Sequence, residues 1–500
     1  MIPPRLKGSQ LAYAESAIPV SLVGSFRYAF ATKGQLRKEI FGGLIVALAL
    51  IPESIAFSVI AGVDPAVGLF SSVIMAIVIS FTGGRPAMIA AATGAVAVVI
   101  APVARTYGLD YFLATVILAG IFQLVLAAVG VAKLMRFLPR SVMVGFVNAL
   151  ALVVLMAQLP HLIGVPLLVY PLVVAGVAVL LLLPRLSTAI PGPLVVVVIL
   201  TALTAGLGWN VPTVRGQGEL PTSLPELLVP NVPLTWETFR IIAPFALGMA
   251  LVGLMESLLT AKLIDDITAS HSSKARESFG QGVANICSGL FGGMGGCTMI
   301  GQTLINVKEL GARTRLSTLL AGSFLLALLM LLQDVVGLIP MAALVAIMLI
   351  VVLRSFDWHS VAPRTLRAMP VSETLVMLTT VVVTLATSNL AIGVVTGVLV
   401  AMVNFARHVA QMVEVAETPE GYRVTGQLFF ASSNDLIYFF DYSRALPEVV
   451  IDFSGATVWD TSAAATLDAI SQKYQDRGIP VHFTGLDAAS AERVERFAES

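Results

Sequence analysis

Two acidic residues lie inside long apolar stretches of the sequence, where a charge is costly. Glu53 follows Pro52 in the first such stretch, and Glu256 lies in the middle of another. A charged side chain at the centre of a bilayer costs at least ~2.5 kcal/mol and by default marks a functional site. A carboxylic acid withdrawn from water also binds a proton more readily. Glu256 is therefore the candidate for proton coupling, with Thr260 four residues on and on the same helix face.

Both carboxylates also allow a structural interpretation. Glu256 can instead bond the backbone of a neighbouring broken helix, and Glu53 can satisfy a backbone group that Pro52 leaves free. Phe57 lies four residues after Glu53 on the same face. It either walls the site or packs as an ordinary core aromatic, and the sequence leaves these alternatives open.

Two glycine-rich segments precede short apolar runs at matching places in the two halves of the chain, 83–86 and 292–296. Clustered glycines weaken a helix by ~1 kcal/mol each, so they predict extended chain that leads into half-helices, although tight helix packing is their other common role. A half-helix that begins within the membrane presents free N–H groups and a partial positive charge, which suit an anion. The expected anion-binding residues are those of the two first turns: Thr93, Gly94, Ala95 and Val96, and Gly301, Gln302 and Thr303.

The composition places these elements in a membrane. Of the 500 residues, 57% are hydrophobic and 12% charged, with 30 basic and 30 acidic residues, and the mean hydropathy is +0.91. A soluble domain carries about 25% charged residues. A soluble enzyme, a disordered chain and a nucleic-acid binder with a basic surface are excluded. The two cysteines, Cys287 and Cys297, are interpreted as small packing residues, and no metal or cofactor is expected.

Fourteen apolar segments are expected to form a membrane domain over residues 38–407. A polar, Pro- and Gly-rich segment, 209–240, separates seven from seven. Because seven is odd, the two halves enter the membrane from opposite sides, as in the inverted repeats of many secondary transporters. The expected segments are 38–61, 66–82, 87–104, 111–132, 141–163, 167–183 and 193–208, and then 241–263, 280–294, 298–310, 316–332, 336–353, 371–388 and 390–407.

Basic residues indicate the orientation. With the N-terminal segment 1–37 in the cytoplasm, most basic clusters fall inside, among them Lys133, Arg136 and Arg140. Only Arg105, Arg215 and Arg240 fall outside. A multi-pass protein of the plasma (inner) membrane with both termini cytoplasmic is expected, and no cleavable signal peptide is apparent.

The tail, residues 412–500, has the mixed pattern of a small cytoplasmic α/β domain. It predicts a strand at 449–455, a turn at 459–462, a helix at 463–476 and a strand at 477–485. The turn Asp460-Thr461-Ser462 is interpreted as a helix cap.

Several motifs resemble the sulfate permease family of anion transporters over nearly the whole length of the chain. The tail is similar to the STAS domain that commonly follows such transporters. The motifs are Pro52–Phe57, Ala61–Pro65 and Gly68–Ser72 in the first half, and Gly282–Asn285, Gly289–Gly293, Asn306 and Gly311–Ser317 in the second.

The resemblance implies a helical membrane domain of fourteen segments in two inverted repeats, arranged as a core domain and a gate domain, and a homodimer. It also implies a substrate site between the starts of segments three and ten, with contacts from segments one and eight. Matched by position, these are the residues already named. Many family members carry glutamine in place of Glu53 and an arginine near Gln302 and Thr303. The missing positive charge weakens the expectation of tight binding to a dianion such as sulfate.

The predicted function is secondary active transport, as proton-coupled symport of sulfate, bicarbonate or a small dicarboxylate such as fumarate, by movement of the core domain against the gate domain. The expected partners are this anion, a proton and the lipid bilayer, with no nucleic acid. A passive anion channel or an anion exchanger is the main alternative, and a nucleobase permease a weaker one. An enzyme is not expected, because the sequence shows no nucleophile–His–acid set and no phosphate-binding glycine loop.

Overall fold

The computed structural model describes residues 21–130, 139–186, 192–220, 223–387, 389–433, 435–444 and 446–498. The chain divides into two compact units, Met1–Gly397 and Val398–Ser500. Lys133, Arg136 and the first twenty residues of the expected N-terminal segment lie outside the described residues.

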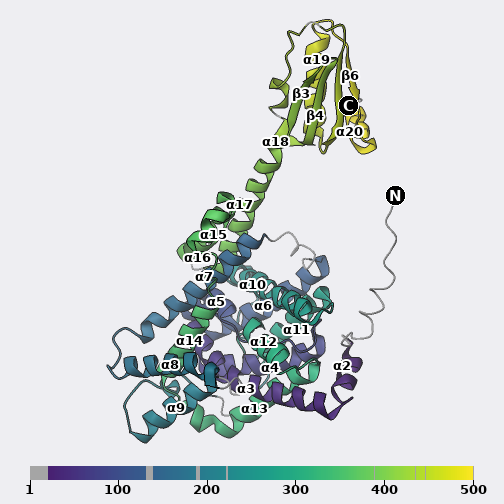
Figure 1. Cartoon of the computed structure of the whole chain (residues 1–500). Helices are drawn as coiled ribbons and strands as arrows, with labels where there is room; N and C mark the ends of the chain where they lie inside the picture. The colour runs from purple at the N-terminus through teal and green to yellow at the C-terminus, as the bar shows by residue number, and fades with distance from the viewer. Residues whose placement is uncertain are drawn as a thin grey trace. The chain divides into compact units, whose positions relative to one another are not determined.

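The first unit is a bundle of apolar helices (Figure 1). Each of the fourteen expected segments overlaps a described helix, although the helix of the third segment begins only at Gly94. Within the described residues, seven helices have the length and composition needed to cross a membrane, and several others are apolar but shorter. The helices of the first half are α2 (Leu22–Ala29), α3 (Lys33–Ala61), α4 (Pro65–Thr82), α5 (Gly94–Tyr107), α6 (Leu109–Val129), α7 (Arg140–Gln158), α8 (Val169–Leu186) and α9 (Gly192–Gly206).

The second half begins with the longest helix and contains a short, interrupted one. Its helices are α10 (Trp236–Thr268), α11 (Lys274–Leu290), α12 (Ile300–Leu304), which continues directly as a π-helix (Ile305–Glu309), α13 (Arg315–Gly337), α14 (Met341–Ser355), α15 (Pro363–Ala368), α16 (Val371–Thr387) and α17 (Leu390–Ala410).

The helices pack in two groups, which match the core and gate domains expected from the resemblance. The core group contains α3, α4, α5, α6, α10, α11, α12 and α13, and the gate group contains α7, α8, α9, α14 and α16, with α17 against α16. The groups meet where α3 packs on α9 and α14 and where α5 packs on α7. Glycines lie at close helix crossings, for example Gly120 of α6 against Gly282 of α11, because small residues let helix backbones approach closely in a membrane.

A buried carboxylate fixes the start of α13. Glu39 of α3 is 0% exposed. It accepts hydrogen bonds from the backbone amides of Arg313 (2.8 Å), Thr314 (3.1 Å) and Ser317 (3.2 Å). The amides of Arg313 and Thr314 lie just before α13, and the amide of Ser317 lies in its first turn. None of them has an acceptor within the helix. A side chain from the first half of the chain thus caps a helix of the second half.

The polar segment between the halves is more ordered than its composition suggests. Val214 is 0% exposed. Its amide donates to the carbonyl of Ile339 (2.9 Å), and the amide of Met341 donates to the carbonyl of Pro212 (2.8 Å). The part around Val214 therefore pairs with the chain between α13 and α14, because its valine is buried and its backbone groups need partners.

The second unit contains a four-stranded sheet of order β3-β4-β5-β6. Its elements are β3 (Glu414–Thr418), β4 (Gly421–Leu428), α18 (Phe430–Ser433), β5 (Val449–Val458), α19 (Thr461–Gln475), β6 (Val481–Thr484) and α20 (Ala488–Ala498). β3 pairs antiparallel with β4, and β4, β5 and β6 run parallel. Asp460 caps α19 as expected, accepting from the amide of Ala463 (2.9 Å). The last strand begins later than expected, because Gly478 turns the chain at φ +76°.

Candidate anion-binding site

Two short strands bring two broken helices together in the first unit. β1 (Ala90–Ala91) pairs antiparallel with β2 (Cys297–Thr298), in the register Ala90 with Thr298 and Ala91 with Cys297. α5 begins at Gly94 and α12 at Ile300, so each helix starts just beyond its strand. The expectation of half-helices after the two glycine clusters is confirmed, and their N-termini meet at the strand pair.

One glycine is essential to this pairing. A Cβ atom at Gly296 would collide with the carbonyl oxygen of Ala91. The amide of Gly296 donates to Oδ1 of Asn285 (2.8 Å), and Nδ2 of Asn285 donates back to the carbonyl of Gly296 (3.1 Å). The glycine therefore serves a close backbone approach that positions the start of α12.

Both helix starts present backbone N–H groups. The first intrahelical bonds are donated by the amides of Ala97, to the carbonyl of Thr93 (2.9 Å), and of Thr303, to the carbonyl of Met299 (3.1 Å). The amides before them, Gly94–Val96 and 300–302, precede the helical ladder. Such N–H groups and the helix dipole favour a bound anion.

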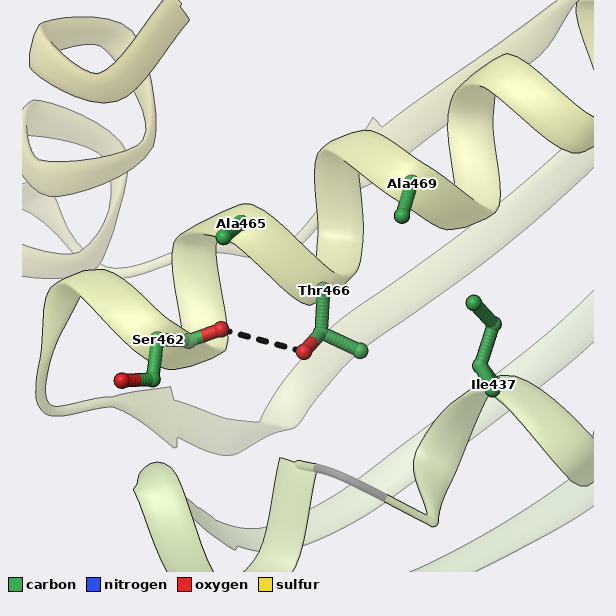
Figure 2. A pocket seen from close by; sticks show the side chains of 5 residues that line it. All are labelled: Ile437, Ser462, Ala465, Thr466 and Ala469. Carbon is green, nitrogen blue, oxygen red and sulfur yellow. Dashed lines mark hydrogen bonds between the residues drawn. The ribbon is translucent and has the colours of Figure 1, made fainter.

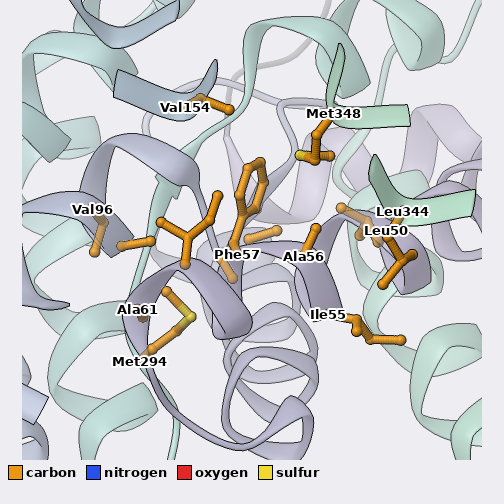
Figure 3. Packing of buried hydrophobic residues seen from close by; sticks show 14 of the residues in the cluster. Leu50, Ile55, Ala56, Phe57, Ala61, Val96, Val154, Met294, Leu344 and Met348 are labelled. Carbon is orange, nitrogen blue, oxygen red and sulfur yellow. The ribbon is translucent and has the colours of Figure 1, made fainter. Parts of the chain in front are cut away.

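Side chains pack against the start of α5 but leave the start of α12 open. A Cβ at Gly94 would lie 2.9 Å from Cε1 of Phe57 and 3.3 Å from Cγ2 of Val154, whereas a Cβ at Gly301 would have no neighbour within 4 Å. Figure 3 shows the ring of Phe57 pointing between Val154 of α7 and Met348 of α14. Phe57 therefore lies where the core and gate groups meet, over the start of α5, while the start of α12 is open.

Glu53 contacts α12. Its Oε1 accepts a hydrogen bond from Nε2 of Gln302 (2.8 Å), and the side chains are buried, with 7% and 3% exposed. Within the described residues, Oε2 of Glu53 and Oε1 of Gln302 have no hydrogen-bond partner. Two acceptors without a donor in the same place suit a site that receives a proton or a ligand with its own donor.

Glu256 contacts the strand pair. The thiol of Cys297 lies 2.9 Å from Oε2 of Glu256 and 3.1 Å from Oγ1 of Thr93. Cys297 packs in the buried core as interpreted, and the register of β2 also places its thiol between these two side chains. The hydroxyl of Thr260 instead donates to the backbone carbonyl of Glu256 (2.8 Å), on its own helix.

The side chains of the remaining expected residues, Ala95, Val96 and Thr303, are buried beside the site. Ala95 and Val96 are buried in the core, with 1% and 0% exposed. Oγ1 of Thr303 accepts from the amide of Ile89 (3.1 Å), next to β1. Ala95 and Val96 therefore offer the site their backbone amides, and Thr303 holds the strand pair in place.

Glu277, which was not predicted from the sequence, anchors both strands. Its Oε2 accepts from the amides of Gly84 (2.8 Å) and Arg85 (3.2 Å), in front of β1. Its Oε1 accepts from Gln281 (3.2 Å) and from Oγ1 of Thr298 in β2 (3.4 Å). The signal for it is a polar stripe at helical spacing along α11: Glu277, Gln281, Asn285 and Ser288.

The second unit has a shallow groove of about 390 Å³, lined by Ile437, Ser462, Ala465, Thr466 and Ala469 (Figure 2). The hydroxyl of Thr466 is bonded to the carbonyl of Ser462 (3.0 Å). The lining contains no charged side chain, so the groove does not resemble the site at the two helix starts.

Comparisons with known proteins agree with this arrangement. A model of the sulfate permease family matches residues 36–170 and 167–380, and a STAS domain model matches residues 410–498. YbaR, a putative sulfate transporter of Bacillus subtilis (strain 168), is 46% identical over 469 residues, which are 93% of this chain and 98% of that protein.

Two solved structures share the fold. The murine anion transporter Slc26a9 in the inward-facing state aligns with a TM-score of 0.81 at 17% identity, over 99% of this chain and 92% of that one. The transmembrane domain of the cyanobacterium bicarbonate transporter BicA aligns with a TM-score of 0.63 at 25% identity, over 73% of this chain and 97% of that one.

Proposed function

The chain belongs to the sulfate permease family, a family of multi-pass membrane anion transporters, and on that premise we propose that it is a secondary active transporter that moves one anion together with a proton. The relatives found are transporters rather than enzymes. The observation that carries the proposal is the meeting of two helix N-termini with two half-satisfied carboxylates, Glu53 and Glu256.

Electrostatics argue for the proton. A carboxylate about 4 Å from a bound anion opposes it by about 4 kcal/mol at an effective dielectric constant near 20. A helix N-terminus contributes about 0.3–1 kcal/mol, and at most about 2 kcal/mol in a buried site. Two helix ends therefore do not outweigh one ionised glutamate, and a proton on that glutamate removes the opposition. Binding of the anion and of the proton then favour each other.

Glu256 is the residue to which we assign the proton, and Glu53 lines the anion site with Phe57, Gln302 and the amides of the two helix starts. Glu256 suits this role because its carboxylate lies beside the strand pair and accepts one hydrogen bond within the described residues, from the thiol of Cys297. The substrate class is a small oxyanion or carboxylate: sulfate, bicarbonate or a dicarboxylate such as fumarate. The absence of a basic residue from the named set favours a singly charged form at the moment of transport.

The two helix groups suggest how the anion moves. The core group carries both helix starts, and the gate group covers one of them through Val154. Sliding of the core group past the gate group would expose the site to the two sides of the inner membrane in turn. A homodimer and cytoplasmic termini remain predictions.

The test is uptake into proteoliposomes with an imposed inward proton gradient, for sulfate, bicarbonate and fumarate in parallel. Accumulation of one anion above equilibrium that collapses with a protonophore is expected, and it identifies the substrate. Equilibration that is insensitive to the gradient would instead favour a passive channel or an exchanger.

A further inference from the structure

Cys297 connects the two halves of the proposed site. It is 0% exposed, and its sulfur lies between Oε2 of Glu256 on α10 and Oγ1 of Thr93 at the start of α5. Thr93 occupies the N-cap position of α5, yet its side chain makes no capping hydrogen bond to the helix. Its hydroxyl is therefore directed to the thiol instead of the backbone amides.

The direction of this hydrogen-bond chain depends on Glu256. An ionised carboxylate only accepts, whereas a protonated one donates through its O–H, and a thiol or a hydroxyl can do both. With Glu256 ionised, the thiol donates to Glu256, and the hydroxyl of Thr93 donates to the sulfur. With Glu256 protonated, its O–H donates to the sulfur, the thiol turns to donate to Oγ1 of Thr93, and the hydroxyl hydrogen of Thr93 becomes free.

We propose that Cys297 is a positioning residue that couples the proton site to the anion site by this reversal. The inference rests on the proposed proton symport. The proton that binds Glu256 stays on its carboxylate, and only the S–H and O–H groups rotate. The freed hydroxyl of Thr93 then donates to an anion at the start of α5, beside the amides of Gly94 to Val96. Protonation thus adds one donor to the anion site and removes one negative charge from it.

Among the described residues, few charged groups lie near this hydrogen-bond chain of Glu256, Cys297 and Thr93. Glu53 of α3 is bound to Gln302 of α12, and Glu277 of α11 contacts Thr298, the neighbour of Cys297 in β2. Arg105 of α5 and Asp110 of α6 lie at the far end of α5 from Thr93. Oε2 of Glu53 and Oε1 of Gln302 are buried and have no hydrogen-bond partner within the part of the chain that the structure describes, an independent sign that a ligand or a proton binds at this site.

The transport test compares Cys297→Ala and Cys297→Ser with the matched control Cys287→Ala. Cys287 is the other cysteine of the chain and lies on α11. The probe is the anion among sulfate, bicarbonate and fumarate that the wild-type protein takes up, and the readout is its KM at acid and alkaline external pH. The wild type and Cys287→Ala should show a KM that falls on acidification.

Serine can donate and accept, so Cys297→Ser should keep this pH dependence. Cys297→Ala should show a weaker pH dependence, because without the thiol the hydroxyl of Thr93 is free to donate to the anion at every pH. Its KM at alkaline pH should fall roughly tenfold to hundredfold toward the acid value, the effect of one hydrogen bond to a charged group. If Cys297→Ala keeps the wild-type dependence of KM on pH, the proposal is overturned. A wild type with no proton-driven uptake would instead contradict the proposed symport.

An infrared measurement tests the reversal without transport. In a Cys287→Ser background, the S–H stretching band comes from Cys297 alone. The band should shift on acidification as the thiol changes its acceptor from a carboxylate to a hydroxyl, and it should stay fixed in the Glu256→Gln variant of that background. If the band of the Cys287→Ser protein, which retains Glu256, is independent of pH, the proposal is overturned whether or not transport is proton-driven.

Discussion

Four buried or half-buried glutamates in the membrane domain differ in how fully their oxygens are used. Glu39 and Glu277 each accept several hydrogen bonds, mostly from backbone amides and at the ends of helices or strands. Glu53 and Glu256 each have one donor within the described residues, an amide and a thiol. Filled acceptors suit a structural role, and free acceptor capacity suits a proton or a ligand. The contrast supports the assignment of Glu53 and Glu256 to the proposed site and of Glu39 and Glu277 to the fold.

Gln302 supplies the one described donor to Glu53, so its replacement tests the anion site at the scale of a single residue. Gln302→Met keeps the size and removes the amide. We expect the KM for the transported anion to rise about tenfold or more, because an unpaired buried carboxylate costs about 1–3 kcal/mol. Thr260→Val is the control and should transport normally, since within the described residues the Thr260 hydroxyl donates only to a backbone carbonyl of its own helix. An unchanged KM in Gln302→Met would remove Glu53 from the site.

At the scale of elements, alanine substitutions at two glycines near β2 should have opposite effects on folding. Gly296→Ala should prevent the pairing of β1 and β2 and yield little folded protein, because its Cβ would meet the carbonyl of Ala91. Gly301→Ala should fold, because the space around it is open, but it should weaken anion uptake by placing a methyl group at the start of α12. Size-exclusion profiles and uptake assays distinguish the two. Normal uptake by Gly301→Ala would move the anion away from α12.

The sequence was sufficient to locate both broken helices and their first turns. Glycine clusters are local signals, and the expected first turn Thr93–Val96 lies at the start of α5, with Thr93 in the N-cap position. The contacts of Cys297 could not be predicted from the sequence, because they depend on the register of two strands some two hundred residues apart in the chain. Thr303 and Thr260 were assigned to the correct elements, but the partners of their hydroxyls depend on backbone geometry that helical periodicity does not specify.

At the scale of the whole molecule, the STAS domain has its own sheet and its own hydrophobic core. We therefore expect it to regulate rather than perform transport. A chain truncated before residue 412 should insert and retain part of its uptake. The measurement is uptake per inserted protein. Complete loss of uptake in a folded, inserted truncation would show that the domain takes part in the mechanism.

The isolated tail, residues 412–498, should lose stability in acid. The amide of Ser454 lowers the pKa of Asp452, and the amide of Ser490 lowers the pKa of Asp487. A carboxyl whose pKa is lowered by folding stabilises the fold above its unfolded pKa, about 3.9, and this contribution fades as the pH falls through the folded value. Thermal melts followed by circular dichroism should show a constant Tm near neutrality and a fall below about pH 4. In Asp487→Asn the fall should be smaller; an equal fall would assign it to other groups.

Accumulation of the transported anion by Glu256→Gln, in proteoliposomes with an inward proton gradient, tests the central claim most directly. The substitution keeps the shape of the side chain and removes its proton exchange. The account predicts that the variant folds, still equilibrates the anion across the membrane, and no longer accumulates it when the wild type does. Accumulation by Glu256→Gln with the pH dependence of the wild type would contradict the account.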